Sequence, residues 1–585
     1  MEHKLTFLDG AMGTMLQRHG LKLGEIPELL AITNPDLLTN IHRQYIEAGT
    51  EIVYANTFGA NRRKMQKTPY TVADVVSAAI SAAKKACIGT SARVALDIGP
   101  LGELLEPMGT LPFETAVDMF AEIVDAGVNA GADLICIETM TDLYEAKAAL
   151  LAAKEHSTLP VWVTMSFDAT GRTFTGCTIP SMARTLEGLG ADAIGLNCSQ
   201  GPKQLLPLFQ ELCRVTTLPV IAKPNAGLPD PVDGHYDLPP EEFARTMVDV
   251  VGAGVSIVGG CCGTTPEHIR KMTHRLAGRP VPVHGNLTQR ALTSERASLT
   301  FDLDGPFLIV GERINPTGKK KLQQELREGS FELVTQFAQE QEERGASILD
   351  VNMGMSGIDE KAMMLQALEE VAGVTKLPLS IDSSHVDVQE EALRRYPGRA
   401  LINSISLESE KFEKLLPLAK KYGAMFVLLP LSDEGLPKNL NEKISIIEKI
   451  VARALELGMK KTDIIVDGLV ATVGANKQAA LETLETIRYC HRNGLATTCG
   501  LSNISFGLPE RSCVNSAFLT MAIASGLTMA IANPSQDILV GAAFASDLLL
   551  NKEDSDIRYI EFSGQAKERR EEADAKKEAL LRQSL

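Results

Sequence analysis

The sequence contains two consecutive sets of eight short apolar runs, separated by longer amphipathic stretches such as EAKAALLAAKEH. Eight strands that alternate with helices over roughly 250 residues are typical of a (β/α)8 barrel. The runs lack strict polar–apolar alternation, as expected for strands buried on both faces of a parallel sheet. The sequence therefore predicts an α/β fold of two tandem (β/α)8 barrels. The first set spans 5–10, 51–57, 93–99, 133–139, 160–166, 191–198, 219–225 and 255–262, and the second spans 307–315, 347–352, 378–384, 400–406, 425–430, 463–468, 496–503 and 528–534.

The length of 585 residues exceeds what a single hydrophobic core supports, which agrees with more than one domain. A doubly wound open sheet is the alternative, but no GxGxxG fingerprint follows a first strand. A polar segment with several prolines and glycines covers residues 274–298. We expect a first barrel over residues 1–285, a linker over 286–300, a second barrel over 301–562 and a charged helical tail over 563–585.

Composition excludes several classes of protein. The formal net charge of −16 argues against a nucleic-acid-binding or anionic-membrane-binding protein, because both need basic patches. No run of 18 apolar residues is present, so no membrane span is expected. The start, MEHKLTFLDGAMG, lacks the pattern of a secretory signal. The ten cysteines are therefore expected to be reduced thiols in a cytoplasmic protein.

Three cysteines follow predicted strands of the first barrel. Cys198 lies in GLNCSQGP, and Cys261 and Cys262 lie in VSIVGGCCGTTPEH. Because strand ends of such a barrel share one rim, all three thiols should meet there. Any one cysteine could instead be a small buried hydrophobe, and a closed structural zinc site is a second alternative, although no paired C-x₂₋₄-C is present. Three thiolates would leave one position of a Zn²⁺ ion open, where a substrate thiol would lose its proton yet stay electron-rich.

Other polar residues also follow predicted strands. In the first barrel they are Asp9, Asn56, Asp97, Glu138, Ser166 and Asn225. In the second barrel they are Glu312, Asn315, Asp350, Asn352, Asp382, Asn403, Asp467, Asn503 and Asn533. No cysteine or histidine dominates the second set, so a transition metal is not expected there. Many carboxylates and carboxamides on one rim suit a flat, nitrogen-rich ligand such as a pterin, although about half of them could instead cap helices.

Several motifs resemble a known enzyme family. LDGAMGT (8–14), GLNCSQGP (195–202), KPNAGLP (223–229) and GGCCGTTPEH (259–268) resemble the homocysteine-binding barrel of the cobalamin-dependent methionine synthase family. GERINPTG (311–318), LDVNMG (349–354), SIDSS (380–384), INSIS (402–406) and GLSNISFGLPER (500–511) resemble its pterin-binding, methyltetrahydrofolate barrel. The resemblance covers about residues 1–560 in the order of the family.

The resemblance implies roles for residues of the first barrel. Cys198, Cys261 and Cys262 would hold zinc, and Asn225 resembles the asparagine that can occupy the open zinc position in the absence of substrate. The amino-acid head of homocysteine would face Asp9, Glu138 and Thr139.

The resemblance also implies a folate site in the second barrel. Its residues would be Glu312, Asp350, Asp382, Asn403, Asp467, Asn503, Phe506 and Arg511. Asn403 and Asn503 are expected to polarise the folate or bridge it through water, while Asp382 and Asp467 hold the pterin ring. The segment VDGLVATVG departs from the family, which more often has a proline after the aspartate corresponding to Asp467.

The activity implied by the resemblance is that of a methyltransferase. The methyl group of 5-methyltetrahydrofolate would pass through a cobalamin shuttle to zinc-activated homocysteine, giving methionine and tetrahydrofolate. The D-x-H-x-x-G loop of a cobalamin module is absent from this sequence. We therefore expect the corrinoid to come from a missing module or from a separate corrinoid protein.

Two other functions remain open from the residues. The first is a corrinoid-independent thiol methyltransferase that uses betaine or a sulfonium donor. The second is a non-catalytic protein that binds folate or thiols.

Overall fold

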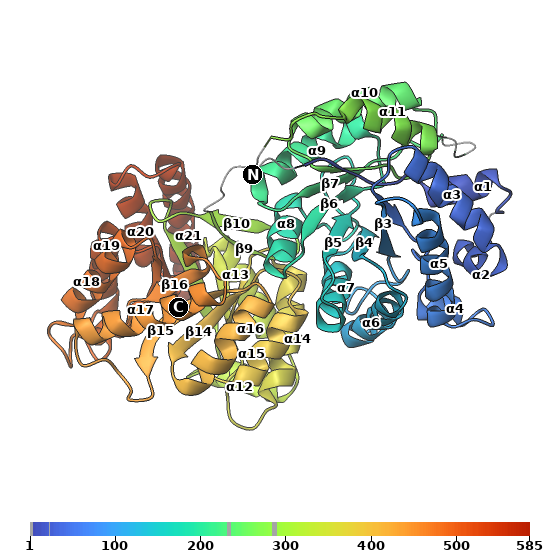
Figure 1. Cartoon of the computed structure of the whole chain (residues 1–585). Coiled ribbons are helices and arrows are strands. Elements are labelled where there is room, and N and C mark those ends of the chain that lie inside the picture. The colour runs from blue at the N-terminus through green and yellow to red at the C-terminus, as the bar shows by residue number, and fades with distance from the viewer. Residues whose placement is uncertain (1–3, 23, 231–233, 235, 283–288, 585) are drawn as a thin grey trace. The chain divides into compact units, whose positions relative to one another are not determined.

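The computed structural model describes residues 4–22, 24–230, 234, 236–282 and 289–584 (Figure 1). The chain divides into two compact units. The first comprises residues up to 287 together with 295–297, and the second comprises 288–294 together with 298–585. The boundary that the sequence predicts between residues 285 and 286 lies outside the described residues.

The first unit is built on an eight-stranded parallel sheet. Its strands follow one another in space in the order β1-β8-β7-β6-β5-β4-β3-β2. An isolated parallel bridge between Leu8 and Ile52 joins the two ends and closes the sheet into a barrel. The strands are β1 (Thr6–Phe7), β2 (Ile52–Tyr54), β3 (Arg93–Ile98), β4 (Leu134–Met140), β5 (Val161–Met165), β6 (Ala193–Asn197), β7 (Val220–Lys223) and β8 (Ile257–Val258). Each lies within one of the eight predicted runs, except that β4 extends one residue past its run, to Met140.

Helices surround this barrel, and local sequence explains where several of them begin. The α5 helix starts at a capping box in which Thr71 and Asp74 satisfy each other's backbone N–H groups. In α3 the side chain of Asn34 accepts from the N–H of Leu37. The helices are α1 (Met12–Arg18), η1 (Pro27–Leu29), α2 (Leu30–Thr33), α3 (Pro35–Glu47), α4 (Arg62–Met65), α5 (Val72–Cys87), α6 (Phe113–Asn129), α7 (Leu143–His156), α8 (Ile179–Gly188), α9 (Pro202–Val215), α10 (Pro240–Gly252) and α11 (Pro266–Leu276).

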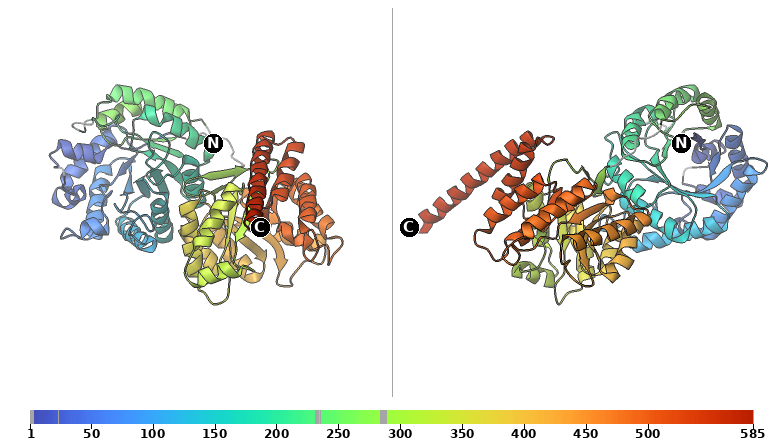
Figure 2. Two further views of the ribbon diagram at one scale, coloured as in Figure 1. Left: turned by 180° about the vertical axis from the view of Figure 1, so that it is seen from behind. Right: turned by 60° about the vertical axis from the view of Figure 1, so that its left-hand side comes forward.

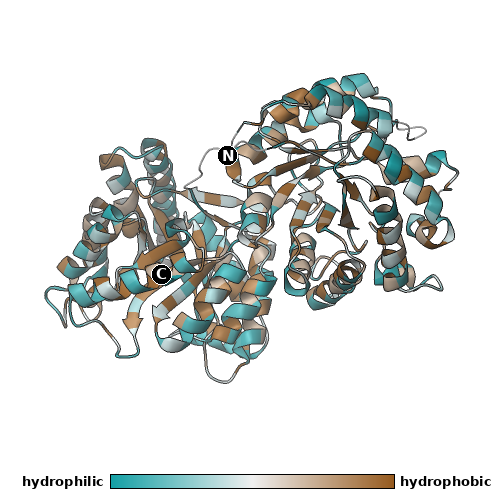
Figure 3. Cartoon of the chain, viewed as in Figure 1, coloured by the Kyte–Doolittle hydropathy of each residue, from teal (hydrophilic) through white to brown (hydrophobic). Residues whose placement is uncertain are grey.

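The interior of the first barrel changes from apolar to charged along the strands. A buried cluster includes Ala95 of β3, Cys136 of β4 and Ile221 of β7 (Figure 3). Two residues further along the same strands are Asp97, Glu138 and Lys223. Because side chains two apart lie on the same face of a strand, these three also face the interior. The charged residues therefore gather inside the carboxyl-terminal end of the barrel.

The second unit contains a second closed parallel barrel. The strand order is β17-β16-β15-β14-β13-β12-β11-β18, and a parallel bridge between Gly500 and Ile531 closes it. Its strands are β11 (Leu308–Ile314), β12 (Ile348–Asn352), β13 (Leu379–Asp382), β14 (Leu401–Leu407), β15 (Met425–Ser432), β16 (Ile464–Asp467), β17 (Ala496–Thr498) and β18 (Met529–Ala532). The structure thus confirms the prediction of two tandem (β/α)8 barrels.

The helices of the second unit follow the same alternation. They are α12 (Lys320–Arg327), α13 (Glu332–Glu343), α14 (Glu360–Val374), α15 (Val386–Arg395), η2 (Lys411–Leu415), α16 (Leu416–Lys421), α17 (Leu440–Glu456), η3 (Lys461–Asp463), α18 (Ala479–Arg492), η4 (Leu501–Ser505), α19 (Arg511–Ala524), α20 (Asp537–Leu549) and α21 (Ser555–Ser584). The long α21 helix begins before the predicted tail and extends beyond α20 in Figure 2. Arg569 of α21 pairs with Asp537 of α20 at 2.8 Å.

An antiparallel hairpin precedes the second barrel and was not predicted from the sequence. Its strands are β9 (Arg290–Thr293) and β10 (Ser298–Phe301). Leu292 and Phe301 join a buried cluster with residues near the starts of the barrel strands, among them Leu308 and Met529. The hairpin therefore covers apolar side chains at the amino-terminal end of this barrel.

Among the residues that the structure describes, no helix combines the length and the apolar character needed to cross a membrane.

One buried histidine makes the stability of the first unit depend on pH. His42 of α3 is fully buried, and neither ring nitrogen has a hydrogen-bond partner among the described residues. Burial lowers its pKa to about 4. Between pH 6.5 and 4 the unfolded chain therefore binds a proton that the folded chain does not, so acidification destabilises the fold. Over this pH range the free energy of unfolding falls by about 3 kcal/mol.

The variant His42→Leu should lose less stability than the wild type on acidification. Urea unfolding at pH 7.5, 6.0 and 4.5 measures this difference. Parallel loss of stability in the two proteins would contradict the assignment.

Candidate active sites in the two barrels

Three thiols meet at the carboxyl-terminal rim of the first barrel. Cys198 follows β6, and Cys261 and Cys262 follow β8, so that their sulfur atoms lie within 4.8 Å of one another. The Sγ atoms of Cys198 and Cys262 are 4.0 Å apart. The intervening strand β7 positions them through its backbone. The N–H of Cys198 donates to the carbonyl of Lys223 at 3.1 Å, and the N–H of Cys261 donates to the carbonyl of Pro224 at 2.8 Å.

The local backbone explains the sequence around these thiols. Cys198 adopts a left-handed conformation with φ of 61°, which costs energy for a residue other than glycine and is often found at functional sites. A Cβ atom at Gly260 would lie 2.5 Å from Oγ1 of Thr264. Only glycine therefore leaves room for Thr264, whose hydroxyl donates to the carbonyl of Cys261 at 2.7 Å.

The chemistry of this cluster suits a metal ion. Hydrogen bonds from Cys198 and Cys261 lower the pKa of Cys262, whereas the same interactions raise the pKa of Cys261. The thiols thus share protons that a divalent cation would displace. Asn225 is buried, and its Oδ1 atom has no hydrogen-bond partner among the described residues. Three sulfur donors fit the four-coordinate preference of Zn²⁺ with one position left open.

Tyr236 is a neighbour of the thiols that the sequence analysis missed. A Cβ atom at Gly263 would lie 2.3 Å from Cβ of Tyr236, so the tyrosine packs directly on this glycine. Burial and the charge of Cys262 raise the pKa of Tyr236. Tyr236 lies in a loop away from any strand end, and no motif marked it.

A buried charge network lies inside the same barrel. The Nζ atom of Lys223 is 3.0 Å from Oε2 of Glu138 and 3.7 Å from Oδ1 of Asp9. It also lies 3.4 Å from the ring centroid of Tyr54, whose N–H donates to Oδ2 of Asp9 at 2.7 Å. Burial raises the pKa of Asp9 to about 6, although Lys223 opposes this shift. The sequence predicted Asp9 and Glu138, whereas Lys223 was not predicted.

Thr139 stands beside this network and is held by Asn197. Its backbone is left-handed with φ of 61°. The N–H of Thr139 donates to Oδ1 of Asn197 at 2.9 Å, and Nδ2 of Asn197 donates to the hydroxyl of Thr139 at 2.7 Å. Thr164 donates to the same Oδ1 atom at 2.8 Å. Asn197 thus supports the predicted substrate residue Thr139 from the neighbouring strand.

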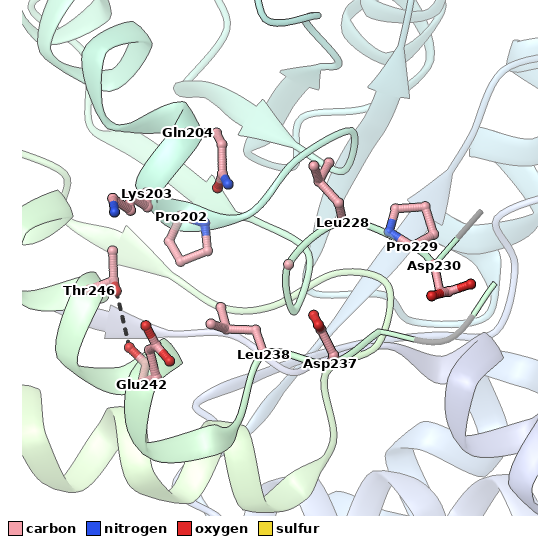
Figure 4. Close-up of a pocket in the computed structure, with 11 residues that line it drawn as sticks. Pro202, Lys203, Gln204, Leu228, Pro229, Asp230, Asp237, Leu238, Glu242 and Thr246 are labelled. Carbon is pink, nitrogen blue, oxygen red and sulfur yellow. Dashed lines mark hydrogen bonds between the residues drawn. The ribbon is translucent and has the colours of Figure 1, made fainter. Parts of the chain in front are cut away.

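An open cavity of about 500 Å³ lies between the start of α9 and the loop after β7 (Figure 4). Its lining includes Lys203, Leu228, Asp237 and Glu242. None of the predicted zinc or homocysteine residues lines it. Some of its lining residues follow Cys198 and Asn225 closely in the sequence, among them Pro202 and Gly227.

A cavity of about 350 Å³ opens at the corresponding end of the second barrel. Four predicted folate residues line it, namely Glu312, Asp350, Asp382 and Asn403. The remaining lining residues are Arg313, Asn315, Thr317, Lys319, Ile531 and Asn533. The sequence analysis noted Asn315 and Asn533 only as strand-end residues. It missed Arg313 of β11 and also Thr317 and Lys319, which belong to the segment between β11 and α12.

Two acidic residues at the centre of this cavity are linked by hydrogen bonds to neighbours. Asp350 accepts from Ser380 at 2.6 Å and from Asn403 at 3.1 Å, in both cases through Oδ1. Asp382 accepts from Nδ2 of Asn352 at 2.9 Å. Burial and the nearby charge of Asp382 raise the pKa of Asp350 to about 8. Since both donors use Oδ1, a proton held by Asp350 at neutral pH sits on Oδ2.

The other four predicted folate residues do not line this cavity. Asp467 is the last residue of β16, Asn503 lies in η4, Phe506 directly follows η4, and Arg511 is the first residue of α19. Asp467 accepts from the N–H of Leu469 at 2.7 Å, and burial raises its pKa to about 6. Asn503 is exposed. Phe506 has 69% of its surface exposed. Arg511 donates to the carbonyl of Ser502 at 2.7 Å and lies close enough to Glu312 to lower the pKa of that carboxyl, which burial raises.

Asp350 should destabilise the second barrel at alkaline pH. Its pKa is about 8 in the fold against 3.8 in the unfolded chain, so between these pH values the folded chain holds a proton that the unfolded chain has lost. Stability therefore falls as the pH rises toward 8, where the buried carboxyl ionises, and levels off above it. In Asp350→Asn, the gain in melting temperature over the wild type should increase between pH 6 and pH 9. Each increase of about 1 kcal/mol in the difference in unfolding free energy corresponds to an increase of roughly 2–4 °C in the difference in melting temperature. The exposed residue Glu434 provides the control variant Glu434→Gln, which should show no such trend. A constant difference between Asp350→Asn and wild type would contradict the raised pKa.

Comparison with known proteins assigns both barrels to families. Residues 6–276 match the homocysteine S-methyltransferase family, and residues 311–533 match the pterin binding enzyme family. Methionine synthase of Mycobacterium tuberculosis is 32% identical over 564 residues, which cover 90% of this chain and 47% of that protein. Methionine synthase of Mycobacterium leprae is 31% identical over 570 residues, with the same coverage. The chain thus spans about half the length of these relatives.

Solved structures similar to the first half include the homocysteine methyltransferase MmuM from Escherichia coli. Its oxidized and metallated forms each show 23% identity and a TM-score of 0.41, and they cover 46% of this chain and 96% of MmuM. The resemblance drawn from the sequence motifs is confirmed by the two family matches. The first barrel of the chain thus matches the homocysteine S-methyltransferase family over residues 6–276, and its second barrel matches the pterin binding enzyme family over residues 311–533.

Proposed function

We propose that the chain is a methyltransferase of the methionine synthase type. The methyl group of 5-methyltetrahydrofolate passes to a corrinoid and from there to zinc-bound homocysteine, giving tetrahydrofolate and methionine. The observation that carries this proposal is the convergence of three thiols on the rim of a homocysteine S-methyltransferase barrel, joined to a pterin-family barrel in one chain. The corrinoid is supplied by another module or another protein.

In the first barrel, Cys198, Cys261 and Cys262 hold Zn²⁺, with Asn225 at the open position before substrate binds. Zinc at this position favours the thiolate form of homocysteine at neutral pH. Asp9 and Glu138 receive the ammonium group of the substrate, and Thr139 faces its amino-acid head. This barrel thus orients a thiolate toward the open rim, where a methyl group can approach.

In the second barrel, the methyl group leaves a tertiary amine, which is a poor leaving group. Proton donation or strong hydrogen bonding at N5 of the folate is therefore needed during transfer. Asp382 and Asp467 hold the pterin ring, while Asn403 and Asn503 polarise it or bridge it through water. The hydrogen bond between Asn403 and Asp350, whose pKa is raised to about 8, places Asn403 next to a group that retains a proton at neutral pH.

Exposed apolar side chains around the thiols support a corrinoid as methyl carrier. Phe58, Met108, Phe174 and Leu228 follow β2, β3, β5 and β7, and between 37% and 74% of their surfaces is exposed. Large apolar side chains on several loops of one rim are typical of a docking surface. A corrinoid presents a broad, partly apolar face to such a surface.

The zinc assignment is tested by removing one thiol. Cys261→Ala should abolish stoichiometric zinc and the methylation of homocysteine while the barrel stays folded. Cys213→Ala, which changes a buried cysteine of α9, is the matched control and should keep both. Zinc analysis and methionine formation from added methylcobalamin provide the measurements. Full zinc occupancy in Cys261→Ala would disprove the ligand assignment.

The two transfers should be separable by mutation. Asp382→Ala removes a charged hydrogen-bond partner of the pterin, which costs about 1.5–3 kcal/mol, or roughly 10- to 150-fold in folate affinity. It should slow methyl transfer from methyltetrahydrofolate to a corrinoid but spare homocysteine methylation from methylcobalamin. Loss of both transfers in a folded variant would mean that the sites are misplaced. Methionine formation from betaine or a sulfonium donor without corrinoid would favour the alternative methyltransferase.

A further inference from the structure

The interior of the first barrel contains more buried carboxylates than buried cations. Asp9, Asp97, Glu138 and Lys223 are between 2% and 8% exposed. Asp97 interacts electrostatically with Glu138, Lys223 and Asp9, so the four groups form one network. A buried charge is costly unless it is paired. Burial and the charge of Glu138 raise the pKa of Asp97 well above its usual range, which favours its neutral form. The single ammonium group of Lys223 then faces the two carboxylates of Asp9 and Glu138, so the network can accommodate a further positive charge.

Lys223 is held rigidly within this network. Its ammonium group contacts Glu138 at 3.0 Å, Asp9 at 3.7 Å and the face of Tyr54 at 3.4 Å from the ring centroid. Burial by itself lowers the pKa of Lys223, but the attraction of Glu138, Asp9 and Asp97 outweighs it and raises the pKa. The amine is therefore a fixed positive charge between carboxylates that come from different strands.

Two carboxylate oxygens of the network lack a hydrogen-bond donor. Oδ1 of Asp9 and Oδ1 of Asp97 are buried, and neither has a hydrogen-bond partner among the described residues. Buried polar atoms are rarely left without partners in folded proteins. An ammonium group with three N–H donors would satisfy such acceptors. The unpaired oxygens thus point to a ligand that carries a primary amine.

We propose that Lys223 is a positioning residue that makes the first barrel select thiols carrying an ammonium group. Its positive charge holds Glu138 and Asp9 close together against their mutual repulsion, and it leaves Oδ1 of Asp97 without a donor and Oδ1 of Asp9 with only its 3.7 Å contact to Lys223, so that both can accept from the substrate. Without this charge, the carboxylates would separate and the acceptor geometry would be lost. This inference rests on the proposed function, because it concerns the same substrate site.

The test compares two thiols that differ only in the ammonium group. Calorimetry on the zinc-loaded full chain measures the affinities for homocysteine and for 4-mercaptobutanoate, which keeps the thiol and the carboxylate. In Lys223→Met, the preference for homocysteine should fall by roughly tenfold or more, as expected for the loss of hydrogen bonds to charged groups. Zinc content and binding of 4-mercaptobutanoate should stay within about twofold of the wild type.

Two further variants sharpen this experiment. Lys223→Arg keeps the positive charge in a different geometry and should show an intermediate preference. Lys84→Met removes a different lysine of the same unit, which pairs with Asp133 at 2.8 Å, and should keep the wild-type preference. If Lys223→Met fails to fold, Lys223→Arg tests the inference in its place. A wild-type preference for homocysteine over 4-mercaptobutanoate in Lys223→Arg would then overturn the inference.

The outcomes distinguish this inference from the proposed function. An unchanged preference in folded, zinc-loaded Lys223→Met would overturn the positioning role and leave the methyltransferase proposal intact. Failure of the wild-type protein to bind either thiol through zinc would contradict the proposed function itself. A preference that falls in Lys223→Met but not in Lys84→Met would support the role of Lys223.

Discussion

The closure of each parallel sheet determines where chemistry can occur in this chain. In a closed parallel barrel every strand ends on the same rim, so residues far apart in sequence become neighbours there. The strand register shows this directly in the second barrel, where Asn352 pairs with Asp382 and Asp382 pairs with Asn403 across three strands. In the first barrel, β7 lies between β6 and β8 and holds the thiols of both through its carbonyl groups.

The same closure forces polar groups into the interior, and the two barrels compensate for this in different ways. The first barrel places the ammonium group of Lys223 between Asp9 and Glu138. In the second barrel, no lysine lies within hydrogen-bonding distance of Asp350 among the described contacts. The carboxyl group of Asp350 instead retains a proton, because burial raises its pKa to about 8. The first interior thus contains a fixed positive charge beside its carboxylates, whereas the second contains a proton that can be lost.

Periodicity and strand-end position predicted most of this architecture. Thirteen of the sixteen barrel strands lie within predicted runs, and β4, β14 and β15 extend one or two residues past theirs. The three cysteines meet as expected because strand ends converge. The β9–β10 hairpin was missed because its two short segments are recognisable as strands only once they pack on the barrel. Lys223 was missed for a related reason. Its position in a strand does not reveal which carboxylates face it, since that depends on the register of β3, β4 and β7.

The separation of the two sites into two barrels has a chemical reason. In the proposed function, activation of homocysteine requires loss of a proton, and the thiol cluster would favour this loss by holding a cation. Release of a methyl group from folate requires the opposite, because the leaving amine must gain a proton or a strong hydrogen bond. A cavity that stabilises a protonated carboxyl, such as Asp350, would be a poor place for a thiolate cluster. Two closed interiors allow each barrel to set its own proton affinity, and a mobile methyl carrier can then serve both.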